Sequence, residues 1–364
     1  MRRIAELDGL RGAAAVMVVA FHIFMNRLPW GWAAVDVFFV LSGYLITTIV
    51  LKQGQGPSWH FLAAFYTRRG LRTWPIYYLL ILVLVLWGSN APRALPYYLT
   101  YLQQAPRYWG GEVSGWVAME HTWTLALEEQ FYLIWPALVL LAGRRRTGPM
   151  ALALAVASIA ARGAGAHWFL LAGRCDGFAL GAFLAAVLGN PDPARGRRLA
   201  LRWAAGLGAI ALLLAIGLAA QGRLLAVGDP TYFRAQATIA SLASFALVAL
   251  VTCSINHPLL APLRMAPLVY LGTISYGLYI YHYPIVMSSQ AICRYLGVRP
   301  GPVLWGTEAL LTLAAAVASW HLIEKPILRL KDRVPYRSVR AWSRAKPVAV
   351  PNPIREPAEV MMAA

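Results

Sequence analysis

The sequence predicts an all-α fold: a polytopic membrane bundle of about ten transmembrane helices with both termini in the cytoplasm. Three observations lead to this prediction. Hydrophobic residues make up 59% of the 364 residues and charged residues only 13%, whereas soluble domains contain about 25% charged residues. Apolar runs of about membrane-spanning length recur along the whole chain. Arginines gather in short clusters between these runs, which is how cytoplasmic loops are marked.

The first three spans follow from the basic segments beside them. The first apolar run begins at Leu7, directly after a basic N-terminus, so the N-terminus is expected inside the cell. The second run begins at Val35 and returns to the inside near Lys52. The third is expected from about Trp74, after the strongly basic segment 66–72. These three runs predict three consecutive crossings of the membrane.

The segment 92–120 is short of apolar residues and is expected to stay on the outer side, in part as a re-entrant segment. A full crossing here would place the triple arginine 144–146 outside, against the charge rule. Without that crossing, all later arginine clusters fall on the cytoplasmic side. The seven further spans are predicted at residues 121–142, 149–166, 168–189, 203–220, 235–254, 266–289 and 303–323.

Single arginines, such as Arg162 and Arg234, are expected in the outer loops. The membrane domain is predicted to cover residues 1–333. Residues 334–364 show no helical period and are expected to form a disordered cytoplasmic tail.

Composition also excludes some functions. The net charge of +18 does not indicate nucleic-acid binding, because the arginine clusters are already explained as cytoplasmic loops. The three cysteines have no metal-binding spacing and read as ordinary membrane residues, so no metal site is expected. Nothing in the sequence indicates the oligomeric state.

Arg11 and His22 are ionisable residues inside the first predicted span. Because an α-helix has 3.6 residues per turn, eleven residues bring a side chain back to within roughly 20° of the same face, about 16 Å along the axis. Such groups at membrane depth are costly and usually face a bundle interior or a wet cavity. Snorkelling to the interface is an alternative for Arg11, but His22 lies too deep for it. We therefore interpret both as residues of a functional site.

Glu128 and Glu129 form the second strong signal, about two turns into the predicted span 121–142. A membrane helix does not need two glutamates for stability, and charges there are expensive unless paired or hydrated. Adjacent carboxylates point in different directions on a helix. We therefore predict that the two glutamates have different functional roles.

Arg69 and Arg72 share one helix face if the third helix begins early. Anchoring of a cytoplasmic helix end is the simpler interpretation of such arginines. However, two guanidinium groups on one face at the mouth of a bundle also suit bidentate phosphate binding.

Other polar side chains are candidates for an acceptor-side or structural role. Arg174 and Asp176 could pair with the two glutamates or line a cavity. His282 lies among tyrosines near the expected outer surface, where an aromatic belt is the usual arrangement. The candidates in this group are Asp36, His121, Arg174, Asp176, Tyr276 and His282.

Several blocks of sequence together resemble the acyltransferase 3 family. Ala34 and Thr124 depart from the pattern, where glycine and serine are expected, and neither removes an essential chemical group. The blocks are residues 7–12 (LDGLRG) with His22, 35–44 (VDVFFVLSGY), 69–72 (RGLR) with Pro75 and 77–78, 123–132 (WTLALEEQFY), 174–176 (RCD), 275–279 (SYGLY), 282–284 (HYP) and 324–326 (EKP).

The resemblance implies an integral membrane acyltransferase that acts on extracytoplasmic glycans or some small molecules. The implied donor is a cytoplasmic acyl-CoA, typically acetyl-CoA, and no permanently bound cofactor is expected. Arg69 and Arg72 would hold its phosphates at the inner mouth of the bundle. Arg11 would grip the pantetheine arm and His22 would meet the thioester, while Glu129, or else Glu128, would orient the imidazole or position the acceptor.

Two choices stay open at this point. Histidine suits proton abstraction because its ordinary pKa is near 6.5, but His22 could instead be acylated transiently. The acceptor could be a surface polysaccharide, lipopolysaccharide, a lipid-linked sugar or a macrolide-like molecule. A proton-coupled transporter or flippase is the alternative function, since intramembrane Arg, His and Glu also suit transport. Internal repeats would favour that alternative, and the sequence shows none.

Overall fold

The computed structural model describes residues 4–24, 27–53, 59–86, 93–106, 117–167, 169–225, 229–334 and 336. Throughout these ranges the regular structure is helical and no strand is present, which confirms the all-α prediction. Seven helices within them are long and apolar enough to cross a membrane. The chain is therefore a polytopic helical membrane protein, and the count of ten spans and the side of the termini stay predictions.

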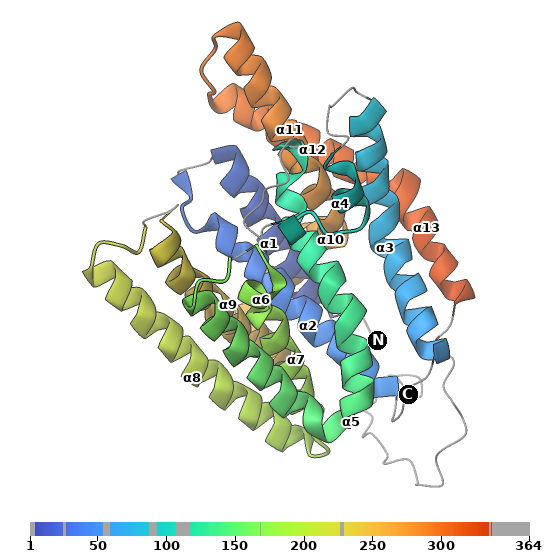
Figure 1. The fold of residues 1–364 in the computed structure, drawn as a ribbon, viewed down its shortest axis with the longest axis vertical. Helices are drawn as coiled ribbons and strands as arrows, with labels where there is room; N and C mark the ends of the chain where they lie inside the picture. Colours follow the sequence, from blue (N-terminus) through green and yellow to red (C-terminus); the bar gives the residue numbers. More distant parts are fainter. Residues whose placement is uncertain are drawn as a thin grey trace, which may run out of the picture.

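The helices lie side by side in one bundle, and the paired helices α11 and α12 extend beyond the others at the top of Figure 1. Shorter helices and helical turns lie between some of the longer helices. The longer helices are α1 Ala5–Phe24, α2 Ala34–Gln53, α3 Trp59–Leu86, α5 Trp123–Gly163, α7 Asp176–Leu188, α8 Pro193–Ala220, α9 Pro230–Cys253, α11 Ser275–Leu296 and α12 Pro302–Ser319. The short ones are α4 Leu95–Leu99, α6 Leu171–Arg174, α10 Ala266–Thr273 and α13 Lys325–Arg329, with 3-10 turns at Gly31–Ala33, Val117–Thr122, Pro258–Arg264 and Leu330–Arg333 and a π turn at Trp320–Glu324.

Helix α5 contains two of the predicted spans. Gly143 has φ 71° and ψ 169°, a conformation that breaks the helix and would strain any residue with a Cβ atom. Trp135 in the first half donates a hydrogen bond to Thr47 of α2, whereas Arg162 in the second half reaches the start of α7. The predicted spans 121–142 and 149–166 are therefore the two halves of α5, on either side of Gly143.

Two helix boundaries differ from the sequence-based expectation. Helix α3 begins at Trp59, well before the expected start near Trp74, so Arg69 and Arg72 lie inside a helix rather than before one. The expected span 266–289 is divided at Ile274 into α10 and α11. The first difference arises because the mostly apolar residues 59–66 before the basic turn form the same helix as the residues after it, and it turns both arginines toward the interior of the bundle.

Glycines allow close contact between the helices that carry the site. A Cβ atom on Gly43 of α2 would lie 1.9 Å from the carbonyl oxygen of Phe178 in α7, and one on Gly181 would lie 2.0 Å from that of Val40. Only glycine fits at such distances, and small residues are how membrane helices approach each other closely. The contact between α2 and α7 is therefore fixed by these two positions.

The basic segments lie at the end of the bundle where α1 begins. Glu6 of α1 forms an ion pair with Arg264 before α10, with 3.3 Å between Oε1 and Nη1. Arg197 at the start of α8 donates to the carbonyl of Cys253 at the end of α9, and Arg144 donates to the carbonyl that follows α7. This arrangement supports the predicted placement of these clusters on one side of the membrane.

The outward faces carry apolar side chains, as expected in lipid. On α8, Leu212, Leu213 and Ile216 are each more than half exposed. A soluble protein rarely exposes such a continuous apolar face, but a lipid bilayer solvates it.

The expected outer segment and tail are described only in part. Within 93–106 the chain forms α4 and turns, and Tyr98 accepts a hydrogen bond from Tyr77 of α3 at 2.9 Å. Residues 107–116 lie outside the described residues. So does most of the predicted tail, although the Tyr336 ring contacts the Phe61 ring of α3 with 5.5 Å between ring centroids.

Candidate active site

Helix α1 carries Arg11 and His22 into two different cavities. Arg11 lines a cavity of about 100 Å³, and His22 lines one of about 250 Å³. Both side chains are half-buried and turned toward the bundle, as their spacing predicts. One helix therefore positions both Arg11 and His22, and each side chain lines a different cavity.

The first cavity is rich in cations, and we call it the arginine pocket. It is lined by Arg11, Arg69 and Arg72, together with the single carboxylate Glu128. Arg11 Nη2 lies 3.4 Å from the Ser275 hydroxyl oxygen. Among its described lining residues, three guanidinium groups face one carboxylate, which suits an anionic ligand.

Glu128 holds one side of the arginine pocket. Its Oε2 atom lies 3.3 Å from Arg69 Nη2, and its Oε1 accepts a hydrogen bond from Ser42 at 3.0 Å. The Arg69 guanidinium also lies over the Tyr132 ring, 3.9 Å from its centroid. Arg69 is therefore fixed by an ion pair and a cation–π contact rather than free in a loop.

Glu129 points away from the arginine pocket, as expected for adjacent residues on a helix. Its carboxylate accepts hydrogen bonds from Thr73 at 3.0 Å and Trp74 at 3.4 Å. The hydrogen bonds of both glutamates thus go to partners other than His22. The expectation that one of them orients the imidazole has no counterpart in these contacts, and their catalytic roles stay predictions.

His22 is oriented by His282, which sequence reasoning had placed in an aromatic belt. That interpretation is wrong, because His282 is fully buried. Its Nε2 atom lies 3.2 Å from Nδ1 of His22, and the two ring centroids are 4.9 Å apart. The pairing joins α1 to α11 over a separation of 260 residues, which no local pattern reveals.

The hydrogen bonds assign the protons on both rings. His22 Nδ1 lies 2.9 Å from the carbonyl oxygen of Val18, and a carbonyl only accepts, so Nδ1 carries the hydrogen. His282 Nδ1 likewise faces the carbonyls of Leu278 and Tyr279, so its Nε2 carries the lone pair. The single Nδ1–H of His22 therefore donates to Val18, and His282 Nε2 lies 3.2 Å from the same nitrogen. Nε2 of His22 keeps the free lone pair that a base needs.

The second cavity lies against His22, and we call it the histidine pocket. No arginine or lysine is found among its described lining residues, in contrast to the arginine pocket. His121 is buried here and stacks on Tyr283, with 5.0 Å between centroids. The lining consists of His22, Tyr98, Gln103, Gln104, Glu120, His121, Trp123, Phe169 and Tyr283.

Tyr279 connects the two cavities. It lines the arginine pocket, and its hydroxyl lies 2.5 Å from Thr124 Oγ1 in the same pocket. The same hydroxyl donates to the carbonyl of His121, which lines the histidine pocket. Tyr276, one turn earlier on α11, also lines the arginine pocket and donates to the carbonyl of Thr73 at 2.5 Å. Helix α11 therefore forms a shared wall of both cavities.

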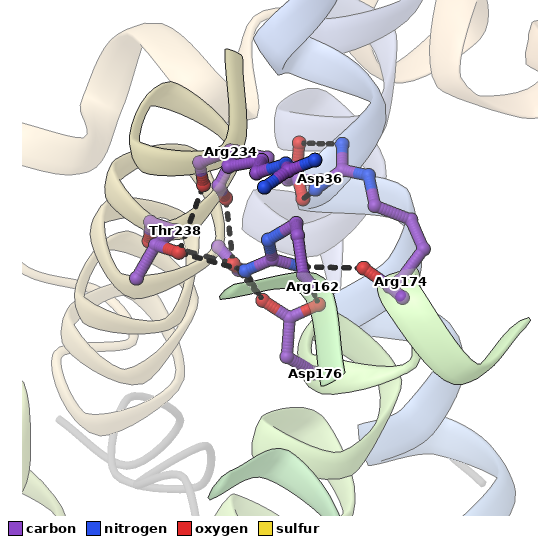
Figure 2. A network of polar contacts seen from close by, with 9 residues as sticks. Asp36, Arg162, Arg174, Asp176, Arg234 and Thr238 are labelled. Carbon is purple, nitrogen blue, oxygen red and sulfur yellow. Dashed lines mark hydrogen bonds and ion pairs between the residues drawn. The ribbon is translucent and has the colours of Figure 1, made fainter. Parts of the chain in front are cut away.

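Figure 2 shows a buried charge network in which Asp36 and Asp176 each face an arginine. Arg174 forms a two-bond ion pair with Asp36, at 2.8 and 2.7 Å. Arg162 does the same with Asp176, at 3.0 and 2.9 Å, and also donates to Thr238 of α9. All four charged side chains are at most 1% exposed.

This network corrects two expectations. Arg174 and Asp176 pair with Asp36 and Arg162, not with the two glutamates of α5. Arg162, expected in an outer loop, is buried in the last turn of α5. Because Arg162 falls inside the predicted span 149–166, the sequence did indicate that it lies within the membrane rather than in a loop. These four residues join α2, α5, α6 and α7 and are structural in their contacts.

Comparison with known proteins gives a consistent result. Residues 4–323 match the family model of an acyltransferase domain, named acyltransferase 3. A putative peptidoglycan O-acetyltransferase, YrhL of Bacillus subtilis, is 30% identical over 90% of this chain and 55% of its own length. The peptidoglycan O-acetyltransferase OatA of Listeria monocytogenes is 29% identical over 89% of this chain and 56% of its own length. The O-acetyltransferase OatA of Staphylococcus aureus is 27% identical over 90% and 57%. The chain thus spans about half the length of these relatives, and no solved structure matches.

Proposed function

Because this membrane-embedded chain belongs to the acyltransferase 3 family, we propose that it moves an acetyl group from cytoplasmic acetyl-CoA to a hydroxyl of an extracytoplasmic glycan. The relatives support the acetyl group and the glycan, since all three are named O-acetyltransferases and two carry peptidoglycan in their names. The protein would act in the plasma membrane. A peptidoglycan-type glycan is the first candidate acceptor, ahead of lipopolysaccharide, a lipid-linked saccharide or a macrolide-like molecule.

The observation that carries this proposal is the pair of cavities that α1 serves. Arg11 belongs to a pocket whose described lining holds three arginines and one carboxylate, and His22 to a pocket lined by neutral polar and aromatic groups together with the carboxyl group of Glu120. Acetyl-CoA is anionic, while a sugar hydroxyl is not. The anionic donor and the uncharged acceptor therefore each have a suitable compartment, and the compartments meet along α1 and α11.

The arginine pocket accounts for how a charged donor could be used without crossing the bilayer. Coenzyme A phosphates match the planar guanidinium fork of arginine. Arg69 and Arg72 lie on α3, closer to the basic end of the bundle than His22 is. The pocket volume of about 100 Å³ admits only a thin part of the donor, so the phosphates would meet Arg69 and Arg72 from the basic side while the acetylated end of the arm enters the pocket. The nucleotide would stay at the basic end.

His22 supplies the base in this proposal. Its Nε2 takes the proton of the acceptor hydroxyl, and the oxygen attacks the thioester carbonyl carbon. The carbon–sulfur bond then breaks, the acetyl group stays on the acceptor oxygen, and the thiolate of CoA takes the proton from His22. His282 holds the opposite ring nitrogen and so keeps Nε2 free for this exchange. Arg11 binds the donor before the step.

The test uses membrane vesicles from cells with and without this chain, supplied with acetyl-labelled acetyl-CoA on the cytoplasmic face. The expected result is labelled O-acetyl groups on extracted glycan, found by mass spectrometry only when the chain is present. Label that stays on the donor while a suitable glycan is available would contradict the proposal. Label that crosses the membrane unattached to any acceptor would favour a transporter.

A further inference from the structure

We infer that the histidine pocket is an acceptor subsite for one uncharged sugar ring, bound by the side-chain carbonyls of Gln103 and Gln104. This inference rests on the proposed function and names the acceptor chemistry of the same site. Both glutamines are buried, at 2% and 8% exposure, and both line the cavity beside His22. Buried amides at that place would otherwise be costly in a membrane protein.

Unpartnered acceptor atoms point to a ligand that donates hydrogen bonds. Gln103 Nε2 donates to the carbonyl oxygen of Thr122 at 3.0 Å, which fixes the orientation of the amide because a carbonyl only accepts. The Oε1 atoms of Gln103 and Gln104 are buried and have no hydrogen-bond partner among the described residues. Buried polar atoms are normally hydrogen-bonded, so each oxygen calls for a donor from outside. Sugar hydroxyls and the N–H of an N-acetyl group are such donors.

His121 is a further polar side chain in the lining of the histidine pocket, beside Gln103 and Gln104. Its ring is buried, and neither ring nitrogen has a hydrogen bond of good geometry among the described residues, although the backbone of Tyr279 and Ile280 lies beside the ring. A neutral imidazole offers one N–H donor and one acceptor. With the two glutamine carbonyls, it forms a set that matches a ring bearing several hydroxyl or acetamido groups.

The charge of the pocket selects against anionic acceptors. Glu120 is an exposed acidic side chain at its lining, and no described lining residue is an arginine or lysine. A phosphate or carboxylate on the bound ring would face repulsion without a cation to offset it. The occupant is therefore uncharged, unlike the donor in the arginine pocket.

Size and shape favour a single ring. The cavity volume of about 250 Å³ lies below the ~300–1,000 Å³ typical of larger ligand sites. Trp123 and Phe169, whose ring centroids are 4.7 Å apart, and Tyr283 give the cavity aromatic surfaces. The weakly positive C–H edges on the face of a sugar ring pack well against the negative face of an aromatic ring. The rest of a longer glycan would lie outside the cavity.

The experiment measures acceptor kinetics with the full chain in membrane vesicles. Chitotriose, an uncharged trimer of N-acetylglucosamine, serves as added acceptor or competitor, and trigalacturonate, with a carboxylate on each ring, as the charged counterpart. We expect chitotriose to accept label or to compete with the native glycan, and trigalacturonate to do neither. Gln104→Leu and Gln103→Leu should each raise KM for chitotriose on the order of three- to tenfold. KM for acetyl-CoA should stay unchanged.

Gln221→Leu is the matched control, because Gln221 is exposed at the end of α8 and bonds only locally to Gly217. If a leucine variant does not accumulate, Gln103→Asn or Gln104→Asn, which shortens the side chain and withdraws the carbonyl, takes its place. Equal use of trigalacturonate, no effect of chitotriose, or unchanged KM in both variants would overturn the subsite. If one of these results is found while the unaltered protein still acetylates the native glycan, the subsite is wrong and the proposed function stands. If the unaltered protein transfers no acetyl group, the proposed function itself is wrong.

Discussion

His282 Nε2 lies 3.2 Å from His22 Nδ1, which also contacts the Val18 carbonyl, and the two contacts leave Nε2 as the free ring nitrogen of His22. The Val18 carbonyl already holds the hydrogen on His22 Nδ1, and His282 adds a second contact to the same nitrogen, which limits rotation of the ring that carries the basic Nε2. His282 is thus a positioning residue for the proposed base. Backbone carbonyls of α11 hold Nδ1 of His282 and so orient its ring, and the His282 ring in turn orients His22 of α1.

We predict that His282→Phe lowers kcat for acetyl transfer by about ten- to a hundredfold and leaves both KM values near those of the unaltered protein. His282→Gln, whose side-chain carbonyl can accept the same hydrogen bond, should recover more activity than phenylalanine does. A purely structural role would instead lower the amount of folded protein in both variants, without this order of kcat values.

Arg72→Ala should raise the apparent KM for acetyl-CoA, because it removes one cation from the arginine pocket without breaking the Arg69–Glu128 ion pair. Arg72→Lys should recover only part of the loss, since lysine keeps the charge but not the planar fork. Initial rates at varied acetyl-CoA would show this. An unchanged KM for acetyl-CoA in Arg72→Ala would show that Arg72 does not bind the donor and would leave helix anchoring as its role.

Arg69→Ala is expected to lower stability as well as donor binding. It leaves the carboxylate of Glu128 without its guanidinium, and Glu128 is only 13% exposed. The double variant Arg69→Ala, Glu128→Gln removes both charges and should recover stability but not donor binding. Thermal unfolding followed by size-exclusion chromatography tests the first part, and KM for acetyl-CoA the second. Equal loss of stability in the single and double variants would contradict the ion-pair explanation.

The network in Figure 2 should be essential for folding rather than for catalysis. Asp176→Ala leaves Arg162 buried and unpaired, which costs about 3–5 kcal/mol. Glu6→Ala is the comparison, because its partner Arg264 is 31% exposed and can be solvated, so the cost should be about 1 kcal/mol or less. The midpoint of thermal unfolding ranks the two variants. A larger shift for Glu6→Ala would refute the structural role given to the network.

The basic clusters should be cytoplasmic together with both termini. In a variant with Cys293→Ser, which removes the one native cysteine that is not buried, a cysteine introduced at Arg145 should resist impermeant maleimide in intact cells. It should react once the inner face is opened. Labelling from outside would reverse the proposed orientation.

The sequence predicted the bundle and part of the site, because membrane solvation leaves a direct mark on composition and spacing. Arg11 and His22 could be placed on one face from helical geometry alone. The contact between His22 and His282 could not, since it depends on how α1 packs on α11. Gln103 and Gln104 carry no periodic signal, and their importance arises only from burial beside His22. Arg162 was misplaced because a helix-end arginine looks the same whether it faces lipid headgroups or a buried aspartate.

The rate of acetyl transfer by His22→Asn tests the proposed chemistry most directly. Asparagine retains polarity at this position but provides no useful proton acceptor, so we predict normal accumulation and a loss of about 10²–10⁴-fold in transfer from acetyl-CoA. His22→Ala should be equally inactive, and Gln221→Leu should match the unaltered protein. Substantial turnover by well-folded His22→Asn would contradict the assignment of His22 as the base.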